Sequence, residues 1–263
     1  MTTWQDFEQN CCDYLTRKYG SYASFDCEGG ADSTRPDIYV RTKSGKSFYI
    51  EAKHCPAQCG QFVLIPDIST ERFVYSPLND TPINSFARVV MQHMDADFEG
   101  FKEAGTSGKD IVTKNGSQVF ADWIIDHYKN KGTKFFITNN YLIFPIEDFA
   151  QYFNVTAKYR IKRSGSSSVG KWSIPSVKRV IASLNLPITN YRVDGSKLFV
   201  SCSKYIHNIR FRYNGYEYMF SQRGSEYEIR KLSNTFNANV IFSIDLKSAA
   251  NSTNENHFIA FLR

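Results

Sequence analysis

The chain has 263 residues, enough for one large domain or for two to three small ones with a sizeable core. Hydrophobic residues make up 42% and aromatic residues 15%, which excludes a disordered chain. No run of eighteen apolar residues is present and no secretory signal opens the sequence, so we expect neither a membrane span nor export. The six cysteines form no regular framework, which favours reduced thiols in the cytoplasm.

The net charge of +6 is unevenly distributed along the chain. Residues 1–154 carry 15 Lys/Arg and 20 Asp/Glu, whereas residues 155–231 carry 15 Lys/Arg and only 4 Asp/Glu. An acidic front and a basic rear predict a metal-binding half and a phosphate-contacting half. An ordinary solvated basic surface is the alternative interpretation.

Apolar residues recur at helical spacing at the start of the chain, where Trp4 and Cys11 mark an amphipathic helix over residues 3–18. The elements expected next are strands at 37–42 and 47–53, helices within 83–103 and 117–131, a hairpin of 134–138 with 141–144, and a short helix at 146–153. This mixture of helices and strands indicates layered α/β or α+β architecture.

Composition shifts after residue 162. The Gly/Ser-rich segment 163–170 is the best candidate for an internal boundary. Beyond it the pattern is mostly that of short strands, at 198–201, 208–213, 216–221, 226–231 and 238–245. We therefore expect a β-rich rear part.

The most informative segment is Pro36-Asp37, thirteen intervening residues, and Glu51-Ala52-Lys53. Hydrolysis of a phosphodiester is helped by a metal ion that activates water and neutralises charge on the phosphate. Mg²⁺ takes one or two carboxylates from a protein and keeps several waters, so Asp37 and Glu51 suit it as ligands. Lys53 would orient the attacking water and place a positive charge beside the transition state.

The geometry of this motif depends on the pairing of its two strands. Glu51 and Lys53 are two residues apart, so they share a face. With a three-residue loop at 44–46, Asp37 lies opposite Lys53 and joins that face, whereas a loop of two or four residues puts it on the other side. We therefore predict an odd-length loop, in which Gly45 supplies the unusual backbone angles.

An acidic-x-Lys triplet is weak evidence by itself, and the chain contains a second one at residues 245–247. The second triplet lacks a Pro-Asp partner across a hairpin, so we interpret it as a solvated strand end. For the first triplet, a surface ion-pair hairpin is the competing interpretation. A zinc site at His54, Cys55 and Cys59 is a further alternative. It is the weaker one, because no clear second pair of ligands follows these residues.

Three further polar residues are candidates for the same site. Glu8 lies close to the apolar face of the first helix and is a candidate additional metal ligand, although a partly exposed helical glutamate explains it equally well. Gln58 and Gln61 follow the Lys53 strand closely and are candidates for contact with DNA or with the site water. Ordinary polar loop residues are the alternative for both.

The rear part offers candidate DNA contacts. Lys158, Arg160 and Lys162 alternate with apolar residues at strand period, which predicts one basic face, and Arg163 and Ser164 follow directly. A solvated edge strand is the alternative. Near the end of the chain, Asn234 and Asn237 are further candidates, which turn chemistry explains nearly as well.

The sequence resembles the HhaI-type restriction endonucleases, which are type II enzymes of the PD-(D/E)xK nuclease superfamily. Two matching blocks, Gln58-Cys-Gly-Gln-Phe and Ser233-Asn-Thr-Phe-Asn-Ala-Asn-Val, are far more specific than Glu-x-Lys. The other matching stretches are 48–53, 62–66, 134–138, 143–147, 159–162, 231–232 and 241–244. The resemblance spans most of the chain, but residues 165–230 match less well.

The resemblance implies a PD-(D/E)xK core with a mixed sheet and flanking helices, followed by β-rich DNA-binding parts. It implies Mg²⁺-dependent cleavage of double-stranded DNA at GCGC, with Asp37 and Glu51 as metal ligands and Lys53 as the catalytic lysine. We expect a catalytic part at 1–115, a DNA-recognition part at 116–175 and a β-rich DNA-binding part at 176–263.

The resemblance also implies a prokaryotic cytoplasmic enzyme and a cognate DNA methyltransferase in the same system. A monomer is favoured over a dimer, because no long apolar dimer helix is apparent. A structure-specific nuclease of the same superfamily, acting on junctions or in repair, and a non-catalytic DNA-binding module are the competing hypotheses. Metal-dependent cleavage separates both enzymes from the binding module.

Overall fold

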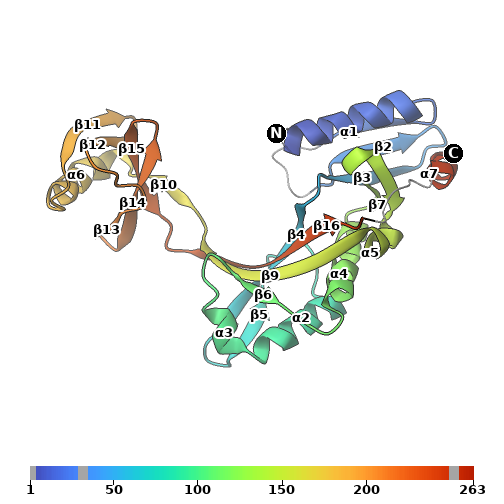
Figure 1. Ribbon diagram of the computed structural model, residues 1–263, viewed down its shortest axis with the longest axis horizontal. Coiled ribbons are helices and arrows are strands. Elements are labelled where there is room, and N and C mark those ends of the chain that lie inside the picture. Colours follow the sequence, from blue (N-terminus) through green and yellow to red (C-terminus); the bar gives the residue numbers. More distant parts are fainter. Residues whose placement is uncertain (1–3, 29–34, 249–254) are drawn as a thin grey trace. The chain divides into compact units, whose positions relative to one another are not determined.

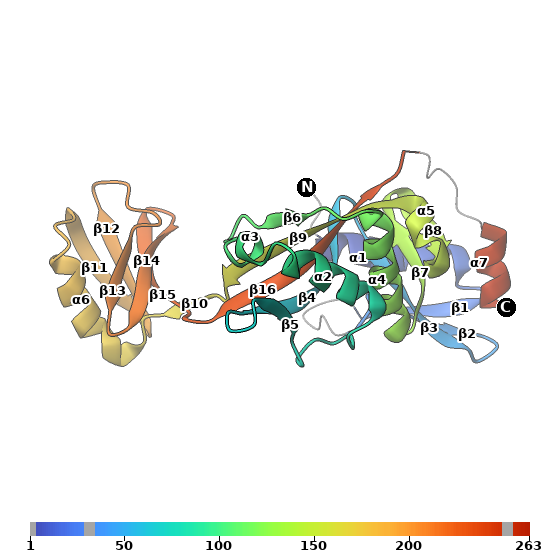
Figure 2. The same cartoon turned by 90° about the horizontal axis from the view of Figure 1, so that it is seen from below.

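The computed structural model describes residues 4–28, 35–248 and 255–263. It forms two compact units (Figures 1 and 2): unit 1 consists of Met1–Arg160 with Ala238–Arg263, and unit 2 of Ile161–Asn237. The expected boundaries after residues 115 and 175 do not coincide with this division. Strand β16 (Phe236–Leu246) returns to pair within unit 1, a non-local contact that composition along the chain does not reveal.

The first sheet of unit 1 places the Glu-x-Lys strand at its centre. Its strand order is β1 (Ala23–Cys27), β2 (Ile38–Thr42), β3 (Ser47–Lys53), β7 (Thr133–Thr138) and β8 (Leu142–Pro145). Strand β3 pairs antiparallel with β2 and parallel with β7, so the sheet is mixed. The short 3₁₀ turns η1 (Asn139–Tyr141) and η2 (Ile146–Asp148) flank β8.

Both faces of this sheet are covered. Phe135 of β7 packs against Phe258 of α7 (Glu255–Leu262), with ring centroids 4.9 Å apart, and α1 (Trp4–Tyr19) joins the same core. The next residue, Phe136, points to the opposite face and packs against Phe149 of α5 (Phe149–Tyr152) at 5.0 Å. Alternation along β7 therefore builds two cores and leaves β3 buried between them.

The second sheet of unit 1 follows the order β5 (Arg72–Tyr75), β4 (Ala57–Asp67), β16, β9 (Phe153–Arg163) and β6 (Lys109–Ile111). Three helices lie beside this sheet (Figure 1): α2 (Ser85–Asp95), α3 (Phe98–Lys102) and α4 (Gly116–Asn130). Trp123 of α4 lies 5.2 Å from Phe62 and 4.7 Å from Phe242 of this sheet. Tyr128 of the same helix lies 5.3 Å from Phe136 of the first sheet. Helix α4 therefore fixes the two sheets to each other.

A β-bulge interrupts strand β4 at Gly60. Two residue steps on β16, from Ile241 to Ser243, match three steps on β4, from Gln61 to Gln58. Gly60 has a φ of +90°, which suits the extra residue of a bulge. Residues three apart on a regular strand point to opposite faces, so the bulge is what brings both glutamines to one face.

Unit 2 is a helix packed on one face of an antiparallel sheet. The sheet order is β11 (Ile188–Asp194), β12 (Lys197–Cys202), β15 (Glu226–Leu232), β14 (Tyr216–Arg223) and β13 (Arg210–Tyr213), with β10 (Ser166–Ser168) also pairing with β15. After the turn η3 (Lys171–Ser173), helix α6 (Ile174–Ala182) buries Val177 and Ile181 against Val200, Phe220 and Ile229. The rear part is therefore β-rich, as expected.

The bulge supports a stability prediction. A Cβ at Gly60 would lie 2.9 Å from Cζ3 of the buried Trp123 ring, whereas a Cβ at Gly45 would meet nothing within 4 Å. The two glycines have nearly the same φ, +90° and +88°. We expect Gly45→Ala to lower the free energy of unfolding by about 1 kcal/mol and Gly60→Ala by about 2–4 kcal/mol, because only the latter adds a steric clash to the backbone strain. Urea denaturation measures both, and equal losses would contradict the packing described here.

Candidate active site

The turn between β2 and β3 sets the geometry of the site. Residues 43–45 form a three-residue loop, in which the Thr42 amide donates to the Lys46 carbonyl at 2.9 Å. The Lys46 amide in turn donates to the Thr42 hydroxyl at 3.1 Å. Gly45, with positive φ, takes the last loop position, where such a turn needs a left-handed residue. The predicted odd loop length is confirmed, but the expected position at 44–46 is wrong by one residue.

The pairing of the two strands is shifted accordingly. Ile38 lies opposite Ile50, so Asp37, one residue earlier, lies beside Glu51 and not opposite Lys53 as expected. The shift is by two residues, which preserves the face on which each side chain lies. The predicted convergence of Asp37, Glu51 and Lys53 is therefore confirmed although the register was wrong.

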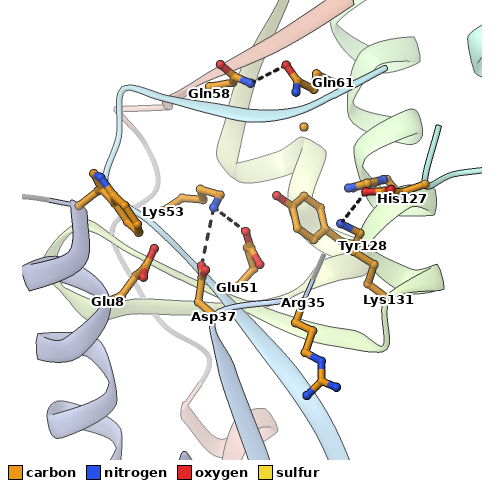
Figure 3. A pocket seen from close by; sticks show the side chains of 13 residues that line it. Glu8, Arg35, Asp37, Glu51, Lys53, Gln58, Gln61, His127, Tyr128 and Lys131 are labelled. Carbon is orange, nitrogen blue, oxygen red and sulfur yellow. Dashed lines mark hydrogen bonds and ion pairs between the residues drawn. The ribbon is translucent and has the colours of Figure 1, made fainter. Parts of the chain in front are cut away.

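The three side chains form a buried ion cluster (Figure 3). Lys53 Nζ lies 2.5 Å from Glu51 Oε1 and 3.7 Å from Asp37 Oδ2. The Ala52 amide donates to Asp37 Oδ2 at 2.9 Å, which fixes this carboxylate against the backbone of β3. The Glu51 and Lys53 side chains are only 5% and 18% exposed, so water screens their interaction weakly.

Glu8 of α1 reaches this cluster. It is 8% exposed and lies beside Asp37 in the lining of the same cavity (Figure 3). Burial, followed by the charge of Asp37, raises the pKa of Glu8 from 4.5 to about 7. Burial and Asp37 likewise raise the pKa of Glu51 to about 7, against the opposing effect of Lys53. Burial acts to lower the pKa of Lys53, but Glu51 and Asp37 outweigh it and raise that pKa, so the lysine is charged.

Helix α4 contributes residues that no sequence pattern singled out. The Tyr128 hydroxyl points toward Glu51 in the cavity wall (Figure 3). His127 stacks on Trp123 and hydrogen-bonds to Thr81, and burial lowers its pKa to about 4, which keeps the ring neutral at pH 7. These residues lie on a helix whose sequence shows ordinary amphipathic spacing, so only the packing of α4 reveals their place.

A cavity of about 360 Å³ opens above the cluster. Gln58 and Gln61 lie on strand β4 and line the wall across from the carboxylates (Figure 3), so they are strand residues, and their loop interpretation is wrong. The lining residues are Trp4, Glu8, Arg35, Asp37, Glu51, Lys53, Gln58, Gly60, Gln61, Asp80, His127, Tyr128 and Lys131.

The predicted basic row lies on β9. Lys158 and Lys162 are exposed and Arg160 is half-buried, while Val155, Ala157 and Tyr159 alternate with this row as buried residues. The predicted alternation is therefore confirmed. Lys158 lies 3.4 Å from Asp110 of β6.

The remaining candidates lie at the entry to and exit from unit 2. Arg163 forms an ion pair with Glu217 at 2.6 Å. Ser164 and Asn234 each donate a side-chain hydrogen bond to a backbone carbonyl, at 3.1 and 3.2 Å. Asn237 is exposed. These contacts show a structural use for Arg163, Ser164 and Asn234, and their DNA contacts stay predictions.

The donor set can be compared with metal preferences. The described residues contain no group of three or more His, Cys, Asp or Glu side chains arranged to hold a metal ion. This finding leaves the zinc interpretation of His54, Cys55 and Cys59 without support. The pair of Asp37 and Glu51 fits Mg²⁺, because that ion needs only one or two carboxylates from the protein.

The buried carboxyl of Glu8 supports a pH prediction. Its folded pKa of about 7 exceeds the ordinary 4.5, so its protonated form stabilises the fold below pH 4.5 and that stabilisation is lost as pH rises through 7. We therefore expect Glu8→Gln to raise the free energy of unfolding of the metal-free protein by about 1–3 kcal/mol at pH 8 and to change it little at pH 5. Denaturation at both pH values tests this, with the exposed Glu103→Gln as control. An equal effect of Glu8→Gln at both pH values would contradict the assignment.

Comparisons with known proteins place the chain in a family. A scan of protein-family models and a search of curated proteins gave no match. Among solved structures, one described as HhaI endonuclease in complex with DNA is 38% identical, with a TM-score of 0.73 and 99% of each chain covered. This similarity confirms the expected α/β (α+β) fold with a nuclease core and a β-rich rear part. The chain belongs to the HhaI-type restriction endonucleases.

Proposed function

We propose that this protein is a Mg²⁺-dependent type II restriction endonuclease that hydrolyses phosphodiesters of double-stranded DNA at a short specific site, GCGC. The observation that carries the proposal is the convergence of Asp37, Glu51 and Lys53 at one cavity. The similar solved structure is named as an endonuclease in complex with DNA, which supports the substrate class.

The proposed chemistry assigns a role to each side chain of the cluster. Asp37 and Glu51 would hold Mg²⁺, and a movement of the Glu8 carboxylate toward them would add it as a further oxygen ligand. When bound, Mg²⁺ neutralises charge on the phosphate and makes water a stronger nucleophile. Lys53 keeps its proton beside the two carboxylates, so its ammonium orients the attacking water and stabilises the charge that develops on the phosphate.

The positioning of the cluster is built into the fold. The Ala52 amide donates to Asp37, and Lys53 forms an ion pair with Glu51, so each carboxylate has a partner in the fold. His127 stays neutral in the cavity wall and adds no charge that would repel a cation. The site is therefore organised before DNA arrives, which favours reaction over reorganisation.

The DNA contacts we propose lie on both units. Gln58 and Gln61 line the cavity, and the row on β9 supplies cations that suit phosphate oxygens. Unit 2 carries 13 Lys/Arg against 4 Asp/Glu over residues 161–237, a balance that favours binding of a polyanion. The proposed contacts beyond the cavity are Lys158, Arg160, Lys162, Arg163, Ser164, Asn234 and Asn237.

The biological setting is part of the proposal. We place the enzyme in the prokaryotic cytoplasm together with a cognate DNA methyltransferase, and we propose that it acts as a monomer. In the described ranges, no helix is both long and apolar enough to cross a membrane.

The function is tested by digestion of a sequenced, unmethylated plasmid with Mg²⁺ and with EDTA, followed by sequencing of the fragment ends. We expect ends confined to GCGC with Mg²⁺ and none with EDTA. Scattered ends would instead support a structure-specific or non-specific nuclease. Binding without any cleavage would support a non-catalytic DNA-binding module.

The assigned cluster is tested by Asp37→Ala. Loss of this carboxylate removes a metal ligand, so we expect cleavage to fall by about 10³-fold or more while DNA binding in Ca²⁺ is retained. The matched control is Asp245→Ala in the second acidic-x-Lys triplet. Asp245 is exposed and Lys247 donates to the Ala150 carbonyl at 2.7 Å, so this triplet has a structural use and its variant should cleave normally. Unchanged cleavage in Asp37→Ala would overturn the site.

A further inference from the structure

Three side-chain amides meet beside the cavity, on neighbouring strands. Gln58 Nε2 and Asn239 Nδ2 each lie 3.3 Å from Gln61 Oε1 and donate to it. The bulge at Gly60 makes this meeting possible, because it turns both glutamines to one face. Two donors on one oxygen hold the Gln61 amide in a single orientation.

In that orientation the amide nitrogen of Gln61 is the group that can hydrogen-bond to a ligand. Both acceptor positions of Gln61 Oε1 are engaged by its two donors. Figure 3 shows the nitrogen of Gln61 on the cavity side, with its oxygen turned toward Gln58. Gln61 is exposed, so a ligand in the cavity can reach its two N–H groups.

Asn239 is held at a cost in free energy. It lies on β16, directly opposite Val63 of β4, and its Oδ1 is buried without a hydrogen-bond partner in the part of the chain that the structure describes. An unpaired buried carbonyl destabilises a fold, and an apolar side chain of similar size avoids that loss. A polar group kept under these conditions points to a role of its donor, Nδ2, toward Gln61.

We propose that Gln61 Nε2 donates a hydrogen bond to a phosphate oxygen of the DNA strand in the cavity, and that Gln58 and Asn239 are positioning residues that fix its amide. The proposal rests on the proposed nuclease function and deepens it. Reading adenine with glutamine requires the amide oxygen as an acceptor and its nitrogen as a donor together. Because the Gln61 oxygen is already engaged, a donor-only contact remains, which guanine O6 and N7 and phosphate oxygens can all accept. The cavity that Gln61 shares with Asp37, Glu51 and Lys53 favours the phosphate.

The location of the amide agrees with this assignment. The same cavity is lined by Asp37, Glu51 and Lys53, the groups proposed to act on a phosphodiester. A neutral donor adds no charge to a cavity whose lining already holds the cations Arg35, Lys53 and Lys131. Gln61 would therefore hold the DNA backbone without disturbing the charge balance of the cluster.

The test uses the full chain and synthetic duplexes that contain the unmethylated target, with one phosphate at a time replaced by a neutral methylphosphonate. Single-turnover cleavage and, without hydrolysis, affinity in Ca²⁺ are measured for wild type, Gln61→Leu and Asn239→Leu. Gln118→Leu is the matched control, because Gln118 lies on the surface of α4 and bonds to Asp122. Thermal unfolding verifies that each variant is folded.

We expect Gln61→Leu to lower the cleavage rate about 10- to 100-fold. At one phosphate, methylphosphonate should lower the affinity and the cleavage rate of wild type about tenfold or more. The same replacement should change these values less than twofold in Gln61→Leu, since this variant has already lost the contact. As a single substitution, Asn239→Leu should lower the cleavage rate about 3- to 10-fold. Added to Gln61→Leu, it should lower the rate less than twofold. The Gln118→Leu control should match wild type.

Equal methylphosphonate effects in wild type and Gln61→Leu at every position would overturn the phosphate contact. A weaker preference of Gln61→Leu than of wild type among duplexes that differ by one base pair would also overturn it, because this result identifies a base contact. Additive losses in the double variant would overturn the positioning role of Asn239. If wild type binds duplex but cleaves none, the nuclease function fails, while the affinities in Ca²⁺ still decide the Gln61 contact.

Discussion

The ion pair between Lys53 and Glu51 is the interaction on which the rest of the site depends. A carboxylate only 5% exposed, with Asp37 and Glu8 beside it, is tolerated because a charged amine lies 2.5 Å away. An unpaired buried charge would cost several kcal/mol. The same pairing keeps Lys53 protonated despite its burial, so one contact both stabilises the fold and maintains the cation that the proposed reaction needs.

The fold supplies this pair with two kinds of support. Backbone geometry acts from one side, through the β2–β3 turn and the Ala52 amide, and helix α4 closes the other side, where Tyr128 lines the cavity. Because α4 also packs Trp123 against the second sheet, the position of the Gln61 wall is tied to the position of the carboxylates. The cavity is thus framed by two sheets that one helix holds together.

Local sequence predicted the parts of the site that depend on local periodicity. The face shared by Asp37, Glu51 and Lys53 followed from strand alternation and an odd turn, whereas the register did not. Buried residues lie opposite one another in either register, so only the position of Gly45 in the loop selects the observed one. The helices and strands with clear periodicity, such as α1, α4, β3 and β7, were likewise predicted.

The parts that sequence did not predict depend on contacts between distant segments. Strand β4 was missed because its alternation is broken at Gly60, and the bulge becomes visible only through its pairing with β16, some 180 residues later. For the same reason the sequence does not distinguish Asn239 from Asn234 and Asn237, which lie in the same polar segment and were predicted as DNA contacts in its place. Similarity to a family predicts the overall fold, but the positions of individual amide side chains depend on the pairing of β4 with β16.

The charge distribution answers a conflict that any metal-dependent nuclease faces, since a metal site needs negative charge and a DNA surface needs positive charge. Here the two demands are separated along the chain: residues 161–237 hold 13 basic and 4 acidic residues, while the rest holds 19 and 22. Inside the cavity the separation cannot be complete, because the phosphate must approach the carboxylates. The proposed role of the neutral amides on the facing wall meets that requirement, since they would donate hydrogen bonds to the DNA while Lys53 stays paired with Glu51.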